Sequence, residues 1–124
     1  LETILSYIFS TKLVTLTKTN FLNRLNAYID KHIADDINVY DLSTYMNISR
    51  TRLYELAKSY LDCGISEYIT NKKILYVKNL LKNTELKIGD LAEKAGFTDY
   101  NYFSKVFRKK AGISPREYRN KLEL

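Results

Sequence analysis

The apolar residues of this chain recur every three or four positions along most of its length, and residues that break regular structure are rare. One proline and four glycines occur among 124 residues. This spacing places apolar side chains on one face of a helix. The sequence therefore predicts an all-α fold with helices over about residues 21–33, 39–46, 50–61, 65–82, 88–95, 99–111 and from 115 onward.

Capping residues support several of these boundaries. Asn38 and Ser49 are good N-caps for the helices that follow them, and Asp41 suits the positive end of a helix dipole. The segment Ser114-Pro115-Arg116-Glu117 has the arrangement of a capping box with proline at the first helical position. Residues 1–19 are less regular, because helical spacing gives way to β-branched residues around Val14 to Thr17. We expect a helix followed by an extended linker there, or the end of a preceding domain.

An internal repeat relates residues 39–69 to residues 88–119. The offset is 49 up to a one-residue insertion and 50 after it, so that Leu42 aligns with Leu91 and Tyr68 with Tyr118. Two turn positions also align, Asn47 with Gly96 and Asp62 with Gly112. Asn, Asp and Gly tolerate a left-handed backbone, so the repeat predicts the same two sharp turns in both copies.

Each copy has the spacing of a helix-turn-helix. A small residue, Ser43 or Ala92, allows close helix crossing, and four residues later comes the predicted turn residue, followed by an apolar residue. The predicted organisation is a first helix-turn-helix subdomain over 20–64, a connecting helix over 65–82 and a second subdomain over 83–124.

The second copy closely resembles the signature of the AraC/XylS-type bacterial transcription regulators. The matching residues are Ile88, Leu91-Ala92, Ala95-Gly96-Phe97, Asp99, Tyr102-Phe103, Phe107, Gly112, Ser114-Pro115 and Tyr118-Arg119. The resemblance covers residues 20–122 and includes Lys73-Ile74, Val77 and Leu80-Leu81 in the connecting helix. It departs mainly in the first copy, where Ala57 stands at a position often occupied by phenylalanine and Asn47 and Asp62 stand where glycine is common.

This resemblance implies two helix-turn-helix subdomains that each place one recognition helix in the major groove of double-stranded DNA. It also implies a sensing or dimerising domain missing from the N-terminal side, and activation through contact with RNA polymerase. Because the chain starts with Leu1 and lacks a signal-peptide pattern, we expect a cytoplasmic fragment of a longer protein.

Composition agrees with an anionic partner. Twenty Lys and Arg oppose fourteen Asp and Glu, which gives a net charge of +6. Residues 39–84 hold seven basic and four acidic side chains and residues 85–124 hold nine and six, so each of these regions carries a surplus of three. We expect phosphate contacts from Arg50, Arg52, Lys58, Lys72, Lys73, Arg108, Lys109, Lys110 and Arg116.

Base reading requires outward side chains near the N-terminal half of a recognition helix. The expected set is Thr51, Tyr54 and Glu55 in the first copy and Tyr100, Asn101, Ser104 and Lys105 in the second. We expect the Asn101 amide to form a bidentate pair of hydrogen bonds with adenine and Lys105 to contact a guanine edge. Glu55 has two interpretations: it accepts from a cytosine amino group, or it pairs with Arg52 or Lys58 and reads no base.

Other functions find little support in the sequence. A single cysteine, Cys63, and a single histidine, His32, match no metal-ligand spacing, and no catalytic constellation or phosphate loop is present. We expect no enzyme activity, metal or cofactor. Most tyrosines, Tyr102 among them, are expected to pack in the core. The alternative function is a basic helical module that docks on a protein or an acidic membrane surface.

Overall fold

The fold was obtained as a computed structural model that describes the backbone of residues 2–122 and the side chains of all of these except residues 2 and 11–16. Its helices are α1 (Glu2–Lys31), α2 (Val39–Met46), α3 (Arg50–Tyr60), α4 (Ile65–Asn83), α5 (Ile88–Lys94), α6 (Tyr100–Ala111) and α7 (Pro115–Leu122), and no strand occurs among residues 2–122. The all-α prediction is confirmed.

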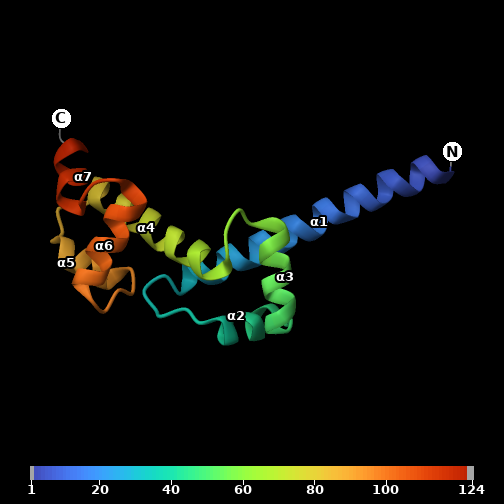
Figure 1. The fold of residues 1–124 in the computed structure, drawn as a ribbon, viewed down its shortest axis with the longest axis horizontal. Helices are drawn as coiled ribbons and strands as arrows, with labels where there is room; N and C mark the ends of the chain where they lie inside the picture. The colour runs from blue at the N-terminus through green and yellow to red at the C-terminus, as the bar shows by residue number, and fades with distance from the viewer. Residues whose placement is uncertain (1, 123–124) are drawn as a thin grey trace.

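Helix α4 connects two packed groups of helices (Figure 1). We call α2, α3 and the C-terminal half of α1 the first subdomain, and α5, α6 and α7 the second subdomain. Helix α4 has 19 residues, which corresponds to a rod of about 28 Å. The N-terminal half of α1 extends away from both subdomains, and residues 3–10 are exposed along it (Figure 1).

The extended linker expected around Val14 to Thr17 is wrong, because α1 continues through these positions to Lys31. β-Branched residues lower helix propensity only slightly, whereas extending an existing helix adds a hydrogen bond for each residue fixed. No proline or glycine interrupts residues 2–31, so nothing in this segment ends the helix.

The predicted caps are largely confirmed. The side-chain oxygen of Asn38 accepts from the Asp41 backbone N–H at 2.8 Å, and Ser49 accepts from the Arg52 N–H at 3.0 Å. Ser114 Oγ accepts from the Glu117 N–H at 3.1 Å. Asp99, expected within the α6 helix, is its N-cap instead and accepts from the backbone N–H groups of Asn101 and Tyr102.

Each subdomain has its own apolar core. The first contains Phe21, Leu25 and Ile29 of α1 packed with residues of α2, α3 and α4. The second contains Ile74, Val77 and Leu81 of α4 packed with residues of α5 and α6, including Phe103 and Phe107. Opposite ends of α4 therefore contribute to different cores, which joins the subdomains through one continuous helix.

The turn inside each helix-turn-helix has the predicted left-handed residue, with φ 57° at Asn47 and 81° at Gly96. The second predicted pair is only half right. Gly112 ends α6 with φ 83°, whereas Asp62 has no positive φ. Helix α3 ends at Tyr60, and its C-cap Leu61 is already extended, so the chain leaves this helix without a left-handed residue.

No helix among residues 2–122 is long and apolar enough to cross a membrane.

Candidate nucleic-acid interface

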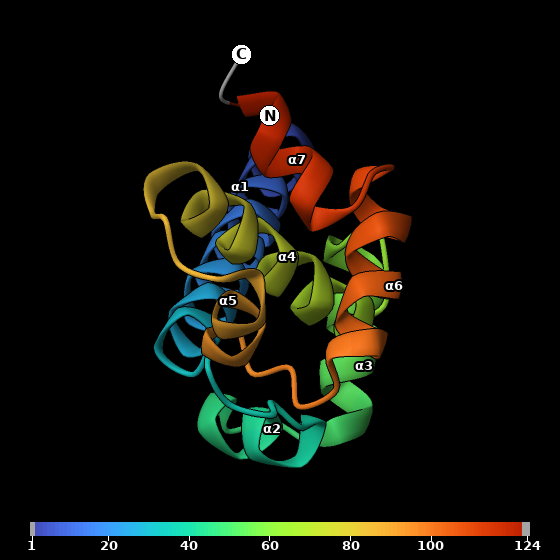
Figure 2. The same cartoon turned by 90° about the vertical axis from the view of Figure 1, so that its left-hand side faces the viewer.

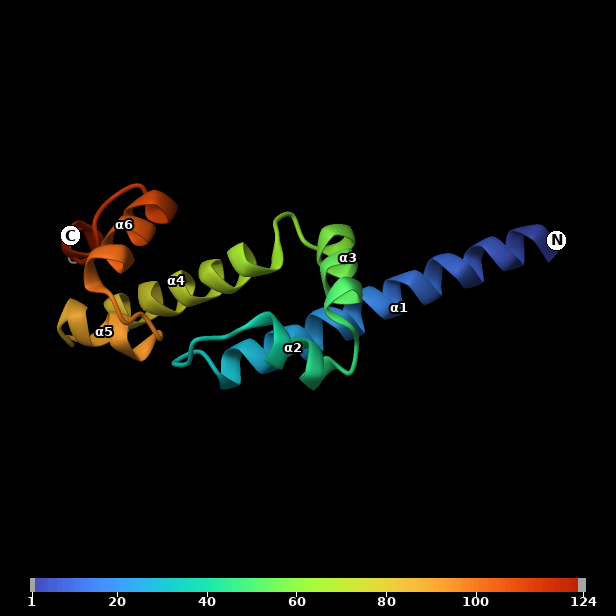
Figure 3. The same ribbon diagram turned by 60° about the horizontal axis from the view of Figure 1, so that its bottom comes forward.

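The second helices of the two helix-turn-helix units, α3 and α6, lie on the same side of the molecule. Viewed along its length, both occupy the right-hand side of Figure 2, whereas α1 and α5 lie to the left of α4. Figure 3 shows the two helices near opposite ends of α4. This placement leaves the outward faces of α3 and α6 open to one shared partner surface.

Helix α3 is anchored by Leu53 and Ala57, which are buried. The opposite face of the helix points outward, and Thr51, Tyr54 and Glu55 are all exposed, as predicted. Arg52 Nη1 lies 3.4 Å from Glu55 Oε2, and both side chains are more than half exposed. The paired interpretation of Glu55 therefore describes this structure, and an exposed pair of this kind is weak enough to open at a charged surface.

Helix α6 is anchored by Phe103 and Phe107, both completely buried. The predicted base-reading positions Tyr100, Asn101 and Lys105 are exposed, and Ser104 is half-buried. Because Asp99 caps the first turn, the start of α6 is fixed where base contact is expected.

A basic hollow lies between α6 and the start of α7. Its lining includes Lys105, Arg108 and Arg116, with Ser104, Ser114 and Tyr100 adding hydroxyl groups. The backbone N–H groups of a helix start and its dipole favour anions, and arginine side chains suit phosphate oxygens. This hollow brings two predicted phosphate contacts, Arg108 and Arg116, beside the predicted base reader Lys105.

The corresponding hollow between α3 and α4 is much less basic. It is lined by Tyr54, Ala57, Lys58, Leu61, Asp62, Cys63, Gly64 and Ile65. Lys58 is the one cation among these lining residues, and Asp62 carries the opposite charge. Arg50, Arg52 and Lys58 are exposed as predicted, whereas Lys72 is half-buried with its ammonium 5.8 Å from the centre of the Tyr68 ring.

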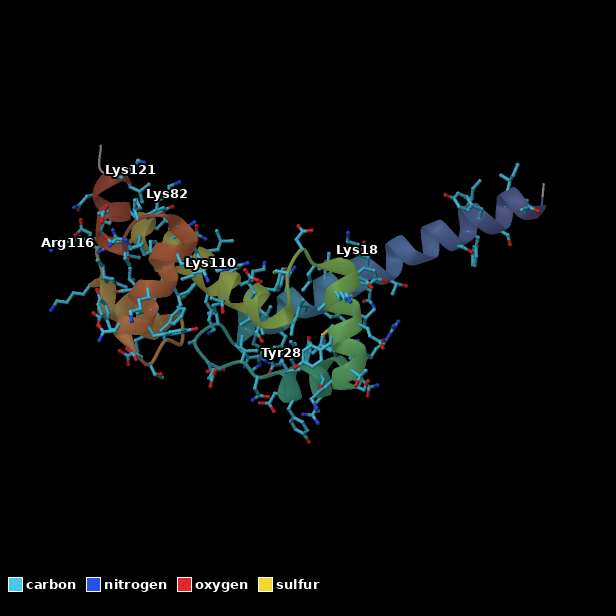
Figure 4. The ribbon with its side chains drawn as sticks, in the orientation of Figure 1. Lys18, Tyr28, Lys82, Lys110, Arg116 and Lys121 are labelled. Atoms are coloured by element: carbon cyan, nitrogen blue, oxygen red, sulfur yellow. The ribbon has the colours of Figure 1, made fainter. Side chains whose placement is uncertain are left out.

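Two further predicted phosphate contacts lie at the end of α6. Lys109 is exposed, but Lys110 Nζ lies 2.7 Å from Glu67 Oε1 on α4. Lys110 faces α4 and the first subdomain, whereas Arg116 lies at the outer edge of the second (Figure 4). The hydrogen bond from Lys110, reinforced by its charge, lowers the pKa of Glu67. Lys110 thus already has an anionic partner within the chain.

The phosphate contact expected from Lys73 is wrong. Lys73 is buried, with 7% of its surface exposed. Its ammonium donates to the carbonyl oxygens of Ile33, Asp35 and Ala95 at 2.6 to 2.8 Å. All three donors of a lysine ammonium are therefore used inside the protein.

Tyr102 is a residue whose environment was predicted wrongly. It was expected in the core but is 56% exposed. It precedes the exposed Lys105 by three positions on α6, so both lie on neighbouring parts of the same helix face. This spacing was the available signal, and it makes Tyr102 an additional candidate for contact with the partner of α6.

The sequence of this chain matches the helix-turn-helix domain family over residues 42–121. It is 33% identical over 98 residues to the transcriptional regulator GbdR of Pseudomonas aeruginosa, covering 79% of this chain and 27% of that protein. It is 30% identical to the transcriptional activator RhaS of Escherichia coli, again over 98 residues, covering 79% of this chain and 35% of RhaS.

A solved structure of an AraC-type transcriptional regulator from Chromobacterium violaceum aligns with a TM-score of 0.79 at 25% identity. The alignment covers 89% of this chain and 96% of that one. This chain belongs to the AraC-type helix-turn-helix family. The AraC-type domain seen here spans about a third or less of the two curated relatives.

Proposed function

We propose that this AraC-type domain is the part of a bacterial transcription regulator that binds double-stranded DNA in a sequence-specific manner. In this proposal, α3 and α6 enter consecutive major-groove segments on one face of the duplex. The supporting observation is the placement of two capped recognition helices on one side of α4, each anchored by buried residues and each with exposed polar side chains.

The proposed site has two kinds of contact. Base edges are read by Thr51, Tyr54, Glu55, Tyr100, Asn101, Ser104 and Lys105, and Tyr102 is added to this set because of its exposure. Phosphates are bound by Arg50, Arg52, Lys58, Lys72, Arg108, Lys109, Lys110 and Arg116. Lys110 joins this set only if it exchanges Glu67 for a phosphate oxygen.

The proposal extends to the whole protein. We place the subdomain boundaries at 20–64, 65–82 and 83–124, and we propose a cytoplasmic regulator that carries a further sensing or dimerising domain and activates transcription through RNA polymerase. The family membership supports this assignment, since GbdR and RhaS are transcription regulators of which the match covers only 27% and 35% of the length. Nothing in the proposed binding involves a chemical reaction or a cofactor.

The test begins with selection of bound sequences from a random pool of duplex DNA, followed by footprinting. We expect two protected segments about 10 base pairs apart, since successive major-groove segments on one face are separated by one helical turn. A single chain suffices for both segments. Protection confined to one short segment contradicts engagement by both helices.

Salt dependence tests the phosphate contacts. If about six phosphates are neutralised, the log–log slope of affinity against salt is near −5. Arg108→Ala is expected to weaken matched and scrambled DNA alike and to reduce the slope by about one. Lys82→Ala is the matched control, because Lys82 is an exposed cation on α4 outside the proposed contacts. A wild-type slope near zero contradicts nucleic-acid binding.

A further inference from the structure

Lys73 is the one buried lysine among the described side chains. Long cationic side chains normally bury the alkyl part and extend the charge to water. The ammonium of Lys73 instead donates to Ile33 O at 2.6 Å, Asp35 O at 2.7 Å and Ala95 O at 2.8 Å. A buried charge is costly unless it is hydrogen-bonded, so this inward arrangement needs all three carbonyls to be held in place.

The three carbonyls come from two different subdomains. Ile33 and Asp35 lie in the loop between α1 and α2, which leads into the first helix-turn-helix. Ala95 is the C-cap of α5, in the turn of the second helix-turn-helix. Since Lys73 itself lies on α4, a single side chain connects the first subdomain, the connecting helix and the second subdomain.

Gly96 marks a close approach at the same place. A Cβ atom built on Gly96 would lie 2.7 Å from Lys73 Nζ, 2.8 Å from Asp35 O and 3.0 Å from Ala34 C, and the φ of Gly96 is 81°. Any larger residue must therefore move the lysine or the loop. Figures 1 and 3 both show the loop after α1 reaching toward the segment between α5 and α6.

We propose that Lys73 is a positioning residue that fixes the second helix-turn-helix against the first, and so sets the separation and relative angle of α3 and α6. Helix α4 alone fixes only the axis that joins the subdomains. The hydrogen bonds of Lys73 add a contact on one side of that axis, where the α1–α2 loop and the α5 C-cap both approach the lysine. A rod with such an off-axis contact resists both bending and rotation about the rod.

Opposing electrostatic influences act on the Lys73 ammonium. Burial lowers the pKa of Lys73, while Asp35 and, to a smaller extent, Asp36 oppose this shift. Both aspartates lie in the same loop as two of the carbonyl acceptors. The ammonium is thus held by three carbonyl dipoles and by the negative charge of the loop that it binds.

The consequence for DNA rests on the proposed function. Two linked binding units gain affinity from each other only when both reach their sites at once, and this gain is commonly about 100-fold or more. A rigid pair of recognition helices requires one half-site spacing. A pair that moves freely accepts several spacings and gains less from each.

The first experiment measures geometry without DNA. In a Cys63→Ser background, spin labels are placed at exposed positions Ser59 on α3 and Lys109 on α6, and the distance distribution is recorded. We expect one narrow distribution for the parent chain and for Lys82→Met, and a clearly broadened one for Lys73→Met, which keeps an unbranched side chain of nearly the same length but has no donors. An unchanged distribution in a folded Lys73→Met variant overturns the proposal.

Gly96→Ala provides an independent variant, because it retains Lys73 in the sequence while the added Cβ atom must displace the ammonium, the loop or both. It is expected to broaden the same distribution. If Lys73→Met fails to fold, this variant decides: a narrow, unshifted distribution in folded Gly96→Ala overturns the positioning role, and a broadened or shifted one supports it.

The second experiment uses selected DNA whose two half-sites are separated by 9, 10, 11 or 12 base pairs. The parent chain and Lys82→Met are expected to prefer one spacing by about 10-fold or more, and Lys73→Met to vary by only about two-fold while binding a single half-site normally. Retention of the full spacing preference by Lys73→Met contradicts the proposal. Failure of the parent chain to bind any DNA contradicts the proposed function, whereas the label distances still test the role of Lys73.

Discussion

The two helix-turn-helix subdomains share a backbone plan but fill their cores differently. In the second, α6 contributes Phe103 and Phe107, which are completely buried and have ring centres 6.0 Å apart. At the position of Phe107 the first subdomain has Ala57, and its aromatic ring comes from Phe21 on α1, 5.7 Å from the ring of Tyr60. The large buried aromatic side chains therefore come from α6 in the second subdomain and from α1 in the first.

The aligned tyrosines show the same difference. Tyr118 packs edge-on against Phe107 at 5.7 Å, whereas Tyr68 donates a hydrogen bond of 2.5 Å to Asn26 on α1. Equivalent tyrosines of the two copies thus have different partners, a ring of α6 for Tyr118 and a side-chain amide of α1 for Tyr68. The turn that defines the helix-turn-helix is kept, while the packing around it is adapted to α1 in the first subdomain and to α4 in the second.

The surfaces differ as well. The hollow at the end of α6 is lined by Lys105, Arg108 and Arg116, and the equivalent hollow at the end of α3 by Lys58 beside Asp62. Under the proposed function, the second subdomain makes the larger electrostatic contribution to binding and the first contributes mainly through direct contacts of α3.

The largest expected effect tests the two sources of aromatic core volume. Phe107→Ala and Phe21→Ala should each lower the free energy of unfolding by about 3 to 5 kcal/mol, because each leaves a cavity in a closed core. Denaturant unfolding measures the loss. Leu75→Ala is the control for a large apolar side chain on a helix, because Leu75 is 53% exposed. A loss below about 1 kcal/mol for Phe21→Ala would mean that α1 does not replace the missing aromatic of α3.

Much of this fold could be predicted because the relevant signals are local. Helical spacing, the caps at Asn38 and Ser49 and the turns at Asn47 and Gly96 depend on a few neighbouring residues, and each was confirmed. The outward positions of α3 and α6 follow from the same periodicity. Their roles in reading bases and binding phosphates stay predictions until DNA binding is measured.

The errors arose where distant segments decide the outcome. Lys73 looks like any basic residue on an amphipathic helix, and only the approach of the α1–α2 loop and the α5 C-cap makes its burial favourable. Asp62 aligns with Gly112, yet α3 ends before a left-handed residue is needed. Tyr102 belongs to an aromatic cluster in sequence, but Phe97 and Phe103 occupy the space inside.

A smaller expected effect, on DNA-binding free energy, distinguishes the base contacts that the proposed function assigns to α3 and α6. Asn101 and Thr51 occupy equivalent positions in the repeat, and both are exposed. Asn101→Ala should cost about 1 to 3 kcal/mol at one base position of the second half-site, since a bidentate contact to adenine is lost. Thr51→Ala should cost less and affect only the first half-site, because threonine offers one hydroxyl and a methyl group.

Binding to matched, singly substituted and scrambled duplexes measures both variants. Thermal melting of each variant controls for folding, since neither side chain lies in a core. If Asn101→Ala weakens matched and scrambled DNA equally, the face or register assigned to α6 is wrong.

The smallest effect concerns the exposed contact between α6 and α4. Glu67 has a lowered pKa because Lys110 donates a hydrogen bond to it. A carboxyl group with a lowered folded-state pKa stabilises the protein above its ordinary pKa, and this contribution is lost as the pH falls through the folded-state value.

Glu67→Gln should therefore lower the melting temperature slightly at neutral pH and low salt. The difference from the parent chain should vanish in strong acid and shrink at high salt, because exposed ion pairs are screened. If the difference instead persists at high salt and low pH, Glu67 contributes through packing or a neutral hydrogen bond, and the ion pair does not hold α6 against α4.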